Sequence, residues 1–557
     1  MHPVTLHLPV SPDAPPVADD RAVVQAAAAA LDLPVDAIAS VVLHRRSLDA
    51  RKRRDARWVL TCTVVLTGED GPQGPDLRAI RPKHLAKPAG DLQPIIVGMG
   101  PAGLFAALQF ADYGVRCTLL ERGPPVERRN YDVRDLRMKG ELHSESNLCF
   151  GEGGAGTYSD GKLYSRSKSP RVREVYERLV ALGLTDRILV DAHPHVGTNR
   201  LIPMAKVLRE VLQEAGHTLR FDARVEDLLI KTDGARPTVV GVRLASGEEL
   251  HGGPVLLATG HSARGMYGTL ARHGVALERK AFAVGARIEH PQALIDKVQL
   301  DEMAGWASIG SAEYFLAQKV PAIGGTRGVY SFCMCPGGFV LPTPTRQDHL
   351  NVNGMSNSGR NSRFANAALV AEIAEGDMYL ETPGDLDDDP DFGVHVAGGA
   401  LLGLALQGAL ERRAYTLGGG GYRAPAQRLT DFVARRDHAD LPARTSYRPG
   451  LTPADCGAAL PSRIADALRR GATQVDRRQL RGYLSEEAVI IPVETTTSSP
   501  VRVLRDAQHE SLSHAGLFPV AEGAGYAGGI VSSAIDGLNA AESVLRRSGV
   551  LIQPPAV

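Results

Sequence analysis

The sequence Ile95-Ile96-Val97-Gly98-Met99-Gly100-Pro101-Ala102-Gly103 decides the fold. Its three apolar residues indicate a short buried strand, and a GxGxxG turn follows them. Apolar residues then recur with helical spacing as far as Ala111, and Gly114 stands where a helix C-cap belongs. Residues 115–120 are typical of a second strand. The pattern therefore predicts the β-turn-α-β unit of a dinucleotide-binding domain.

The residues of the turn have distinct physical roles. Gly98 permits the tight turn, Gly100 lets a pyrophosphate approach the backbone, and Gly103 lets helix and strand pack closely. Pro101 and Ala102 begin a helix whose unpaired N–H groups and positive dipole end favour phosphates. We therefore count all five residues as candidate cofactor-binding residues.

An acidic residue ends the second strand of this unit. There Glu121, followed by Arg122, can accept the ribose hydroxyls of an adenosine. A free 2′-hydroxyl favours FAD or NAD over NADP. NAD enzymes usually complete a second mononucleotide-binding half directly, whereas here the chain runs into the glycine-rich stretch 151–162. This difference favours FAD.

Glycine is frequent and clustered, with 59 glycines among 557 residues. The clusters lie at 98–103, 151–161, 418–421 and 523–529, which indicates backbone that turns sharply or approaches a ligand. In the last cluster, Gly528 and Gly529 precede a long amphipathic helical pattern, so backbone N–H groups again face a ligand. In a flavoprotein such a helix end stabilises negative charge on the reduced flavin.

The composition excludes several protein classes. A hydrophobic content of 43% and a charged content of 23% predict a folded globular chain, neither disordered nor collagen-like. A net charge of zero gives no general attraction to nucleic acid or membrane, although segment 45–57 is basic and segment 372–391 is acidic. Six cysteines and no secretory start predict a cytoplasmic protein without a disulfide scaffold. The near-apolar run 397–410 predicts a buried helix rather than a membrane span.

The glycine-rich blocks together resemble the FAD-binding domain of the glutathione-reductase-like flavoprotein superfamily. More narrowly, nearly the whole chain resembles a bacterial family of FAD-dependent dehydrogenases whose substrate is generally unassigned. The stretches that carry this narrower resemblance are 47–52, 151–163, 330–338, 353–356, 424–427, 494–505 and the terminal glycine-rich block.

The resemblance implies a set of FAD-binding residues. Gly98, Gly100 and Gly103 are expected to hold the pyrophosphate, and Glu121 the adenine ribose. Further along the chain, the expected cofactor contacts are Gly153, Gly154, Ala155, Gly156 and Thr157 along the flavin and its phosphates, Val225 at the adenine, Ala258, Thr259 and Gly260 along the FAD, Glu522 with Gly523 at the ribityl chain, and Gly528, Gly529 and Ile530 at the flavin ring. One departure is Thr496, where relatives often carry Arg.

Other residues are candidates for the chemistry, and no metal site is expected. Asp160 and Lys162 follow the second glycine block, and Lys162 is a candidate to stabilise an anionic reduced flavin or its phosphate. Cys333 and Cys335 form either a redox pair or a structural CxC loop. Arg360, with Arg363 nearby, either binds an acidic substrate or lies in a solvated loop. Two further pairs of alternatives remain open: Glu289-His290 as an acid/base pair or a structural one, and Gly418–Gly421 with Tyr422 as a loop over the flavin or a plain turn.

The predicted fold class is α/β. A Rossmann-like FAD-binding domain, residues 91–270 and 500–550, encloses an inserted α+β substrate domain at 271–499, and a small α+β domain at 1–90 precedes both. In the small domain, residues 4–8, 38–44 and 58–66 read as strands and 20–31 as a helix; later, 204–215 reads as a helix, 218–230 as a strand, and 238–244 with 249–257 as a hairpin.

The predicted function is that of an FAD-dependent oxidoreductase, a dehydrogenase that transfers hydride through flavin N5. FAD is expected to bind non-covalently, with a small molecule or a redox protein as partner and NAD(P)H as a possible transient electron donor. No membrane partner is expected. One alternative is an FAD-dependent RNA-modifying enzyme that uses the basic segment 45–57. A second alternative is a non-catalytic flavin-binding redox sensor.

Overall fold

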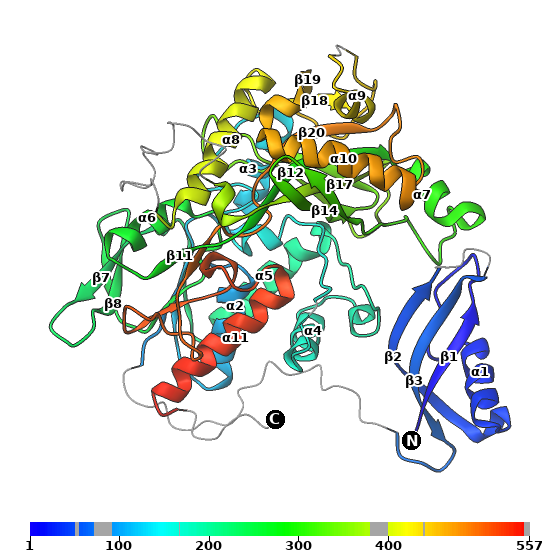
Figure 1. Cartoon of the computed structure of the whole chain (residues 1–557). Helices are drawn as coiled ribbons and strands as arrows, with labels where there is room; N and C mark the ends of the chain where they lie inside the picture. Colours follow the sequence, from blue (N-terminus) through cyan, green and yellow to red (C-terminus); the bar gives the residue numbers. More distant parts are fainter. Residues whose placement is uncertain (51–54, 72–91, 166, 379–398, 438–439, 551–557) are drawn as a thin grey trace.

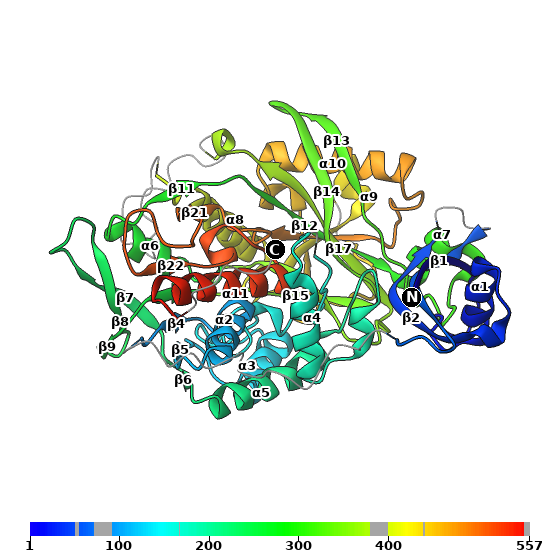
Figure 2. The ribbon, with the colours of Figure 1, turned by 90° about the horizontal axis from the view of Figure 1, so that it is seen from below.

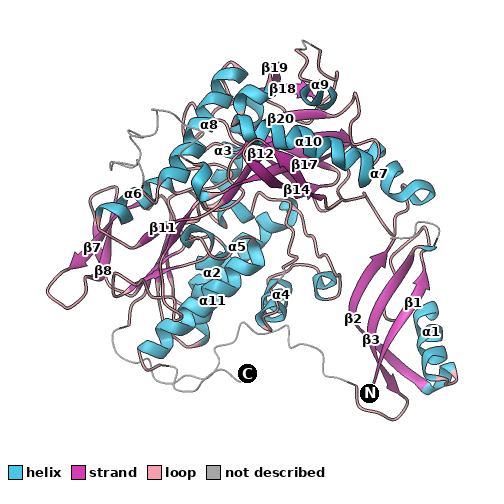
Figure 3. Cartoon of the chain, viewed as in Figure 1, coloured by secondary structure: helices cyan, strands magenta, loops and turns pink. Residues whose placement is uncertain are grey.

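A computed structural model describes residues 1–50, 55–71, 92–165, 167–378, 399–437 and 440–550 (Figure 1). The described residues form a small N-terminal unit, a layer around a parallel sheet, and a layer around a larger, mostly antiparallel sheet. Figure 3 shows the alternation of helices and strands in the two larger layers. This mixed arrangement confirms the predicted α/β class.

The N-terminal unit is a three-stranded antiparallel sheet with one helix. The strands β1 (His2–Pro9), β3 (Arg57–Leu66) and β2 (Ile38–Asp49) are neighbours in that order, and α1 (Arg21–Leu31) packs against the sheet. The predicted elements are confirmed, with one correction. Strand β2 extends to Asp49, which pairs with Arg57, so the start of the basic segment is strand rather than connecting loop. Residues 51–54 of that segment lie outside the described residues.

The parallel sheet holds the predicted β-turn-α-β unit. Its strands, in spatial order, are β22 (Leu517–Pro519), β10 (Val255–Leu257), β4 (Ile95–Val97), β5 (Thr118–Leu120) and β6 (Thr218–Arg220). β4 and its neighbour β10 are buried along their whole length, as apolar strands covered on both faces require. Helix α2 (Pro101–Asp112) connects β4 to β5, and α11 (Ile530–Arg547) packs against α2, as Figure 2 shows from below.

Three strand predictions are wrong in their bounds. The second strand of the unit begins at Thr118 rather than at 115. The stretch 218–230 is two strands, because the chain leaves the parallel sheet after β6 and enters a separate sheet of β7 (Val225–Lys231), β8 (Thr238–Leu244) and β9 (Glu249–His251). The predicted strand 249–257 is likewise two strands, because β9 belongs to the separate sheet and β10 to the parallel sheet. Four further helices lie in this part of the chain: α3 (Val126–Lys139), α4 (Arg171–Ala181), α5 (Thr198–Glu214) and α6 (Arg264–Arg272).

A seven-stranded sheet forms the upper layer in Figure 1. Its strands, in spatial order, are β13 (Ala317–Ala322), β14 (Gly325–Cys335), β17 (Phe364–Ile373), β12 (Phe282–Pro291), β20 (Val489–Glu494), β18 (Ala424–Arg428) and β19 (Leu451–Pro453). Helices α7 (Gln292–Leu300), α8 (Leu402–Gly418), α9 (Leu429–Ala434) and α10 (Ser462–Arg478) accompany it, as do the strand pairs β15 (Gly338–Pro342) with β16 (Val352–Ser356) and β11 (Leu277–Arg279) with β21 (Val501–Val503). Helix α8 is largely buried, as predicted. Among the described residues, no helix combines the length and apolarity that crossing a membrane requires.

The N-terminal unit contacts the larger body through a buried arginine. Arg46 is only 3% exposed, and its Nε donates to Asp191 Oδ1 at 3.0 Å while its Nη1 donates to Pro16 O at 2.8 Å. A second contact joins the backbone N–H of Ser308 to the carbonyl of Pro12 at 3.2 Å. The unit is therefore attached to the segment that precedes α5 and to the segment that follows α7.

Candidate functional site

The turn after β4 is too tight for side chains. Gly98 has φ of +105°, and a Cβ there would lie 2.4 Å from the carbonyl oxygen of Ala258. A Cβ on Gly103 would lie 2.0 Å from the carbonyl oxygen of Gly98. The tight turn and the close helix-strand packing predicted for the GxGxxG motif are therefore present.

A second glycine segment lies against this turn. Gly153 and Gly154 have φ of +78° and +62°, and a Cβ on Gly154 would lie 2.9 Å from the Cα of Gly100. The same segment reaches the C-terminal helix, because a Cβ on Gly156 would lie 3.3 Å from Ile530 Cγ1. Glycine segments far apart in the sequence therefore meet in space.

Two helices begin at this meeting point. A Cβ on Gly156 would lie 3.4 Å from Pro101 Cγ at the start of α2, as well as near Ile530 at the start of α11. A Cβ on Gly537 of α11 would lie 2.0 Å from the carbonyl oxygen of Ala102, so the helices pack closely. The first N–H groups of each helix have no intrahelical acceptor, and each N-terminus carries partial positive charge. We call Gly98–Gly103, Gly153–Thr157, Ala258–Gly260 and Glu522–Ile530 the glycine cradle.

Glu121 ties two parts of the cradle together. Its buried carboxylate accepts backbone N–H groups of Met99, Gly123 and Gly151, each at 3.0 Å. A carboxylate has about four acceptor positions, so one remains for a ribose hydroxyl. That ribose contact stays a prediction. The neighbouring Arg122 instead pairs with Glu145 at 2.8 Å.

The sequence reasoning missed Glu152. Its side chain is buried, and Oε2 accepts the backbone N–H of Val126 at 2.8 Å and Arg209 Nη1 at 3.2 Å. Among the described residues Oε1 has no hydrogen-bond partner. Burial raises the pKa of Glu152 to about 7. No sequence pattern marks this residue beyond its place between two glycines.

The remaining predicted FAD residues lie around the cradle. Gly523 approaches Gly260, since a Cβ on Gly523 would lie 2.9 Å from the Gly260 nitrogen. Glu522 Oε1 lies 3.5 Å from His261 Nδ1. Val225 begins β7, two residues after Ala223, whose N–H donates to the carbonyl of Glu121 at 2.9 Å. At Gly98, Gly103, Gly153 and Gly154 an added Cβ would clash, whereas at Gly260 and Gly529 it would enter open space. A backbone cradle of this kind, with two helix N-termini beside it, fits the pyrophosphate of FAD.

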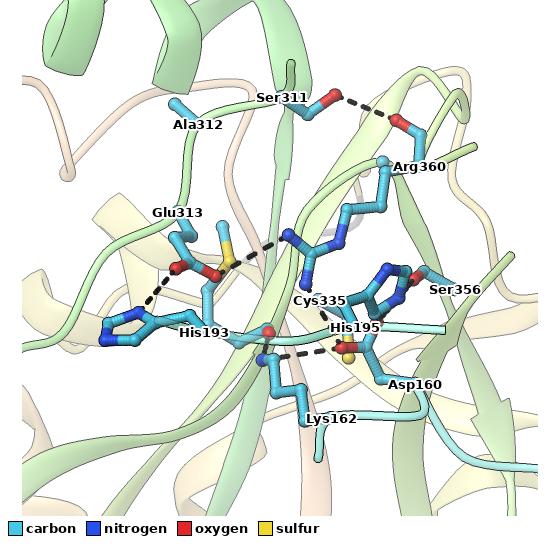
Figure 4. Close-up of polar contacts among 12 residues, drawn as sticks. Asp160, Lys162, His193, His195, Ser311, Ala312, Glu313, Cys335, Ser356 and Arg360 are labelled. Carbon is cyan, nitrogen blue, oxygen red and sulfur yellow. Dashed lines mark hydrogen bonds and ion pairs between the residues drawn. The ribbon is translucent and has the colours of Figure 1, made fainter. Parts of the chain in front are cut away.

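Charged side chains gather directly after the second glycine segment (Figure 4). We call Asp160, Lys162, His195, Glu313, Ser356 and Arg360 the charged cluster. At its centre Asp160 is 5% exposed; Ser356 Oγ donates to its Oδ1, and Lys162 Nζ and Arg360 Nη2 each lie 3.6 Å from its Oδ2. Burial alone would raise the pKa of Asp160, but its contact with His195 and the two cations hold that pKa well below its usual range. Asp160 is therefore ionised.

Two basic side chains, one of them in the charged cluster, hold the CxC segment in place. Lys162 Nζ donates to the carbonyl of Met334, and Arg287 Nη1 donates to the carbonyl of Cys333 at 2.8 Å. Cys333 has φ of +46°, where the pairing of β14 with β17 is irregular. Cys333 is exposed, whereas Cys335 is buried, and burial raises the pKa of the Cys335 thiol to about 12. That pKa disfavours the Cys335 thiolate that redox exchange requires.

A fully buried ion pair, absent from the sequence reasoning, supports this segment. Arg287 Nη2 lies 2.9 Å from Glu494 Oε1, and Arg287 also donates to Asn353. Strand β16 thus contributes Asn353 to the ion pair and Ser356 to the charged cluster. Just before β16, Asn351 Nδ2 donates to Thr496 Oγ1 at 2.9 Å. Thr496, the position where relatives often carry Arg, therefore lies beside the same strand.

The other open alternatives have structural positions. Glu289 and His290 are buried; Ser446 donates to Glu289, and His290 Nε2 lies 2.8 Å from the carbonyl oxygen of Tyr483. We interpret both as structural. Gly419 ends α8, and a Cβ on Gly140 would lie 2.4 Å from the carbonyl oxygen of Gly421, so residues 418–421 form a packed turn. In the described part of the chain, no group of three or more His, Cys, Asp or Glu residues could hold a metal ion.

Comparisons with known proteins identify the family. Residues 281–497 match the family described as FAD-dependent protein, C-terminal domain-like, and residues 3–65 match a domain of unknown function, DUF8436. An uncharacterized protein of Clostridium beijerinckii is 35% identical over 527 residues, which cover 93% of this chain and 94% of that protein.

Solved structures with some similarity include two that extend over most of the chain. CtdE in complex with FAD is 9% identical with a TM-score of 0.29, covering 81% of this chain and 84% of that one. The halogenase PltM is 10% identical with a TM-score of 0.31, covering 83% and 69%. Scores this low carry no argument about fold or site. On the sequence matches, the chain belongs to the same family as the Clostridium beijerinckii protein, and its residues 281–497 form the C-terminal domain typical of FAD-dependent proteins.

Proposed function

We propose that this protein is an oxidoreductase of the glutathione-reductase-like type, a dehydrogenase that transfers hydride between a substrate and flavin N5. The observation that carries the proposal is the glycine cradle, in which the starts of α2 and α11 meet, followed in the chain by the charged cluster. A purely structural nucleotide site would have no need of a partly buried cluster of ionised groups beside it.

The chain's own residues divide the work of holding the cofactor. The turn from Gly98 to Gly103 binds the pyrophosphate, Glu121 orients the adenine ribose, and Glu522 orients the ribityl chain. The start of α11 at Gly529 faces the pyrimidine side, where its dipole favours negative charge. When bound, FAD supplies the two-electron chemistry.

The charged cluster supplies the electrostatics on the substrate side. Lys162 and Arg360 place positive charge beside the site, and ionised Asp160 holds both cations in position. In a site with little water, such fixed charges act more strongly than in solution. Lys162 and Arg360 therefore favour negative charge that develops during reduction, while Asp160 and Glu313 balance their charge, and Arg360 offers its donors to an anionic group of the substrate.

The test begins with the purified protein and its bound flavin. Anaerobic addition of a panel of donors, NADH and NADPH included, is expected to bleach the visible absorbance of oxidised flavin. A flavin that no donor bleaches would instead favour the redox-sensor alternative. Glu121→Ala should lower the FAD content of the purified chain, while Glu210→Ala, at an exposed position on α5, should leave it unchanged. Equal FAD content in both variants would refute the assignment of Glu121.

As a second proposal, the protein is an FAD-dependent RNA-modifying enzyme that binds RNA through the basic segment 45–57. Arg45 and Arg57 are exposed on adjacent strands, whereas Arg46 is occupied by Asp191. Binding to transfer RNA that weakens with salt and disappears when Arg51, Lys52, Arg53 and Arg54 are neutralised would support it. Absence of salt-sensitive binding would exclude it.

A further inference from the structure

Three aromatic rings lie together at the surface beside the charged cluster. The ring centroids of Tyr164 and His193 are 4.8 Å apart at an interplanar angle of 48°, and those of His193 and Phe315 are 6.0 Å apart at 84°. Tyr164 is 48% exposed and Phe315 is 65% exposed. We call these three residues the aromatic platform. Exposed aromatic rings that gather in one place are typical of a binding surface rather than of a core.

The platform and the charged cluster are parts of one surface. His193 Nδ1 lies 3.5 Å from Glu313 Oε1, and Glu313 Oε2 lies 3.7 Å from Arg360 Nη1 (Figure 4). Tyr164 stands two residues after Lys162, and the residue between them, Leu163, is buried. Exposure alternates along this segment, because Leu163 is buried and its two neighbours are not, so a ring and a charge share the open side of the segment.

The segment before β13 repeats this arrangement. Phe315 stands two residues after Glu313, and Tyr314 between them is buried. Two segments, distant in sequence, thus each present one aromatic and one charged side chain to the same region. Such a repeated pattern favours a ligand that has both a flat ring and a charged group.

Arg360 shows which charge the ligand carries. Among the described residues its guanidinium makes no hydrogen bond; it has ion pairs at 3.6 Å and 3.7 Å, and its Nε is buried without a partner. The side chain is only 20% exposed, so water supplies little compensation. Asp160 Oδ2, on a nearly fully buried side chain, is likewise without a hydrogen bond. An anion with two adjacent oxygens, such as a carboxylate or a phosphate, would satisfy the guanidinium with two parallel hydrogen bonds.

We propose that the aromatic platform and Arg360 form a binding site for a nicotinamide dinucleotide, the electron donor of the proposed function. A ring of the dinucleotide stacks on Tyr164 and Phe315, and a phosphate binds Arg360. In the described part of the chain, β4, α2 and β5 form the one strand-turn-helix-strand unit with a GxGxxG turn. A donor therefore binds at a surface of this kind rather than in a dinucleotide-binding domain of its own. This inference rests on the proposed function.

Calorimetric titration of the FAD-loaded protein with NAD⁺ and NADP⁺ tests the site without any redox step. The wild type is expected to bind at least one of the two. Phe315→Ala should weaken that binding by about tenfold, since one stacked aromatic ring contributes roughly this factor. Arg360→Gln should weaken it by at least about tenfold and reduce its dependence on salt. Phe315 is mostly exposed, so its truncation leaves the core intact.

Tyr131→Ala provides the matched control. Tyr131 is 61% exposed on α3, where its ring contacts Arg134, and its removal should leave binding unchanged. If neither dinucleotide binds the wild type, or if Phe315→Ala and Arg360→Gln bind as the wild type does, the proposed site is wrong. Those results leave the proposed function intact if another donor bleaches the flavin. Conversely, dinucleotide binding that depends on Phe315 and Arg360, in a protein whose flavin no donor bleaches, would support the site and refute the oxidoreductase function.

Discussion

The glycine cradle and the charged cluster lie next to each other, but backbone forms the first and side chains form the second. The cradle is backbone: at Gly98 and Gly103 a single added carbon would overlap another residue's carbonyl oxygen. The charged cluster is side chains, and Asp160 and Arg360 come together from segments 200 residues apart. A site made of backbone restricts which residue types are possible and so leaves a pattern in the sequence. A site made of side chains leaves only ordinary charged residues.

The largest change in unfolding free energy is expected for a buried ion pair of side chains. Arg287→Met would leave Glu494 buried without its partner, which costs about 4 kcal/mol of unfolding free energy. The double variant Arg287→Met, Glu494→Leu should recover most of that loss, because both charges are then absent. Urea unfolding measures both values. A single variant as stable as the wild type would show that the pair contributes nothing to the support of Cys333.

The matching change on the backbone side is Gly103→Ala. The new Cβ would lie 2.0 Å from a backbone oxygen, so α2 must move away from β4, at a cost of about 3 kcal/mol and with loss of bound FAD. Gly265→Ala is the control, because a Cβ there has nothing within 4 Å and lies in α6. FAD content and thermal midpoint should fall for the first variant only. Retention of FAD by Gly103→Ala would mean that the cradle tolerates side chains.

The two regions should respond to pH with opposite signs. Burial raises the pKa of Glu152 from the usual 4.5 to about 7, so its contribution to stability is complete below pH 4.5 and is lost as the pH rises through 7. The difference amounts to about 3 kcal/mol. The lowered pKa of Asp160 gives a contribution that is present at neutral pH and lost in acid.

Glu152→Gln separates the two contributions. Relative to the wild type, this variant should gain stability between pH 5 and pH 8 in urea unfolding, because it carries no charge to bury. Glu302→Gln, at an exposed position, serves as the control and should follow the wild type at both pH values. Parallel pH profiles for Glu152→Gln and the wild type would contradict the raised pKa.

The smallest effect is expected where the N-terminal unit meets the larger body. Asp191→Ala removes the acceptor of Arg46, and we expect a loss of about 1 kcal/mol together with faster hydrogen exchange in residues 186–193, which lead to His193 of the platform. Asp233→Ala, in an exposed loop, should change neither quantity. Unchanged exchange in Asp191→Ala would mean that the ion pair of Arg46 with Asp191 does not order the platform.

The same contrast explains how much of the molecule was predictable. The β-turn-α-β unit follows from the sequence around Gly98. Three of the four glycine clusters meet in space, whereas 418–421 packs against Gly140. Asp160 and Lys162 were found because they adjoin a glycine block. Glu313, His193 and Arg287 were not, because only the tertiary structure brings them beside Arg360 and Cys333. The sequence 218–230 suggests one strand, because no glycine or proline separates β6 from β7 where the chain passes from one sheet into another.

The packing of α11 against α2 has a consequence for how the chain folds. Gly537 meets Ala102 and β22 pairs with β10, so the parallel sheet and the cradle need residues from both ends of the FAD-binding part. Contacts between such distant residues form slowly, and a chain is synthesised from its N-terminus. The apolar face of α2 therefore stays uncovered until α11 has been synthesised. FAD binding at the cradle accordingly requires that synthesis has passed α11.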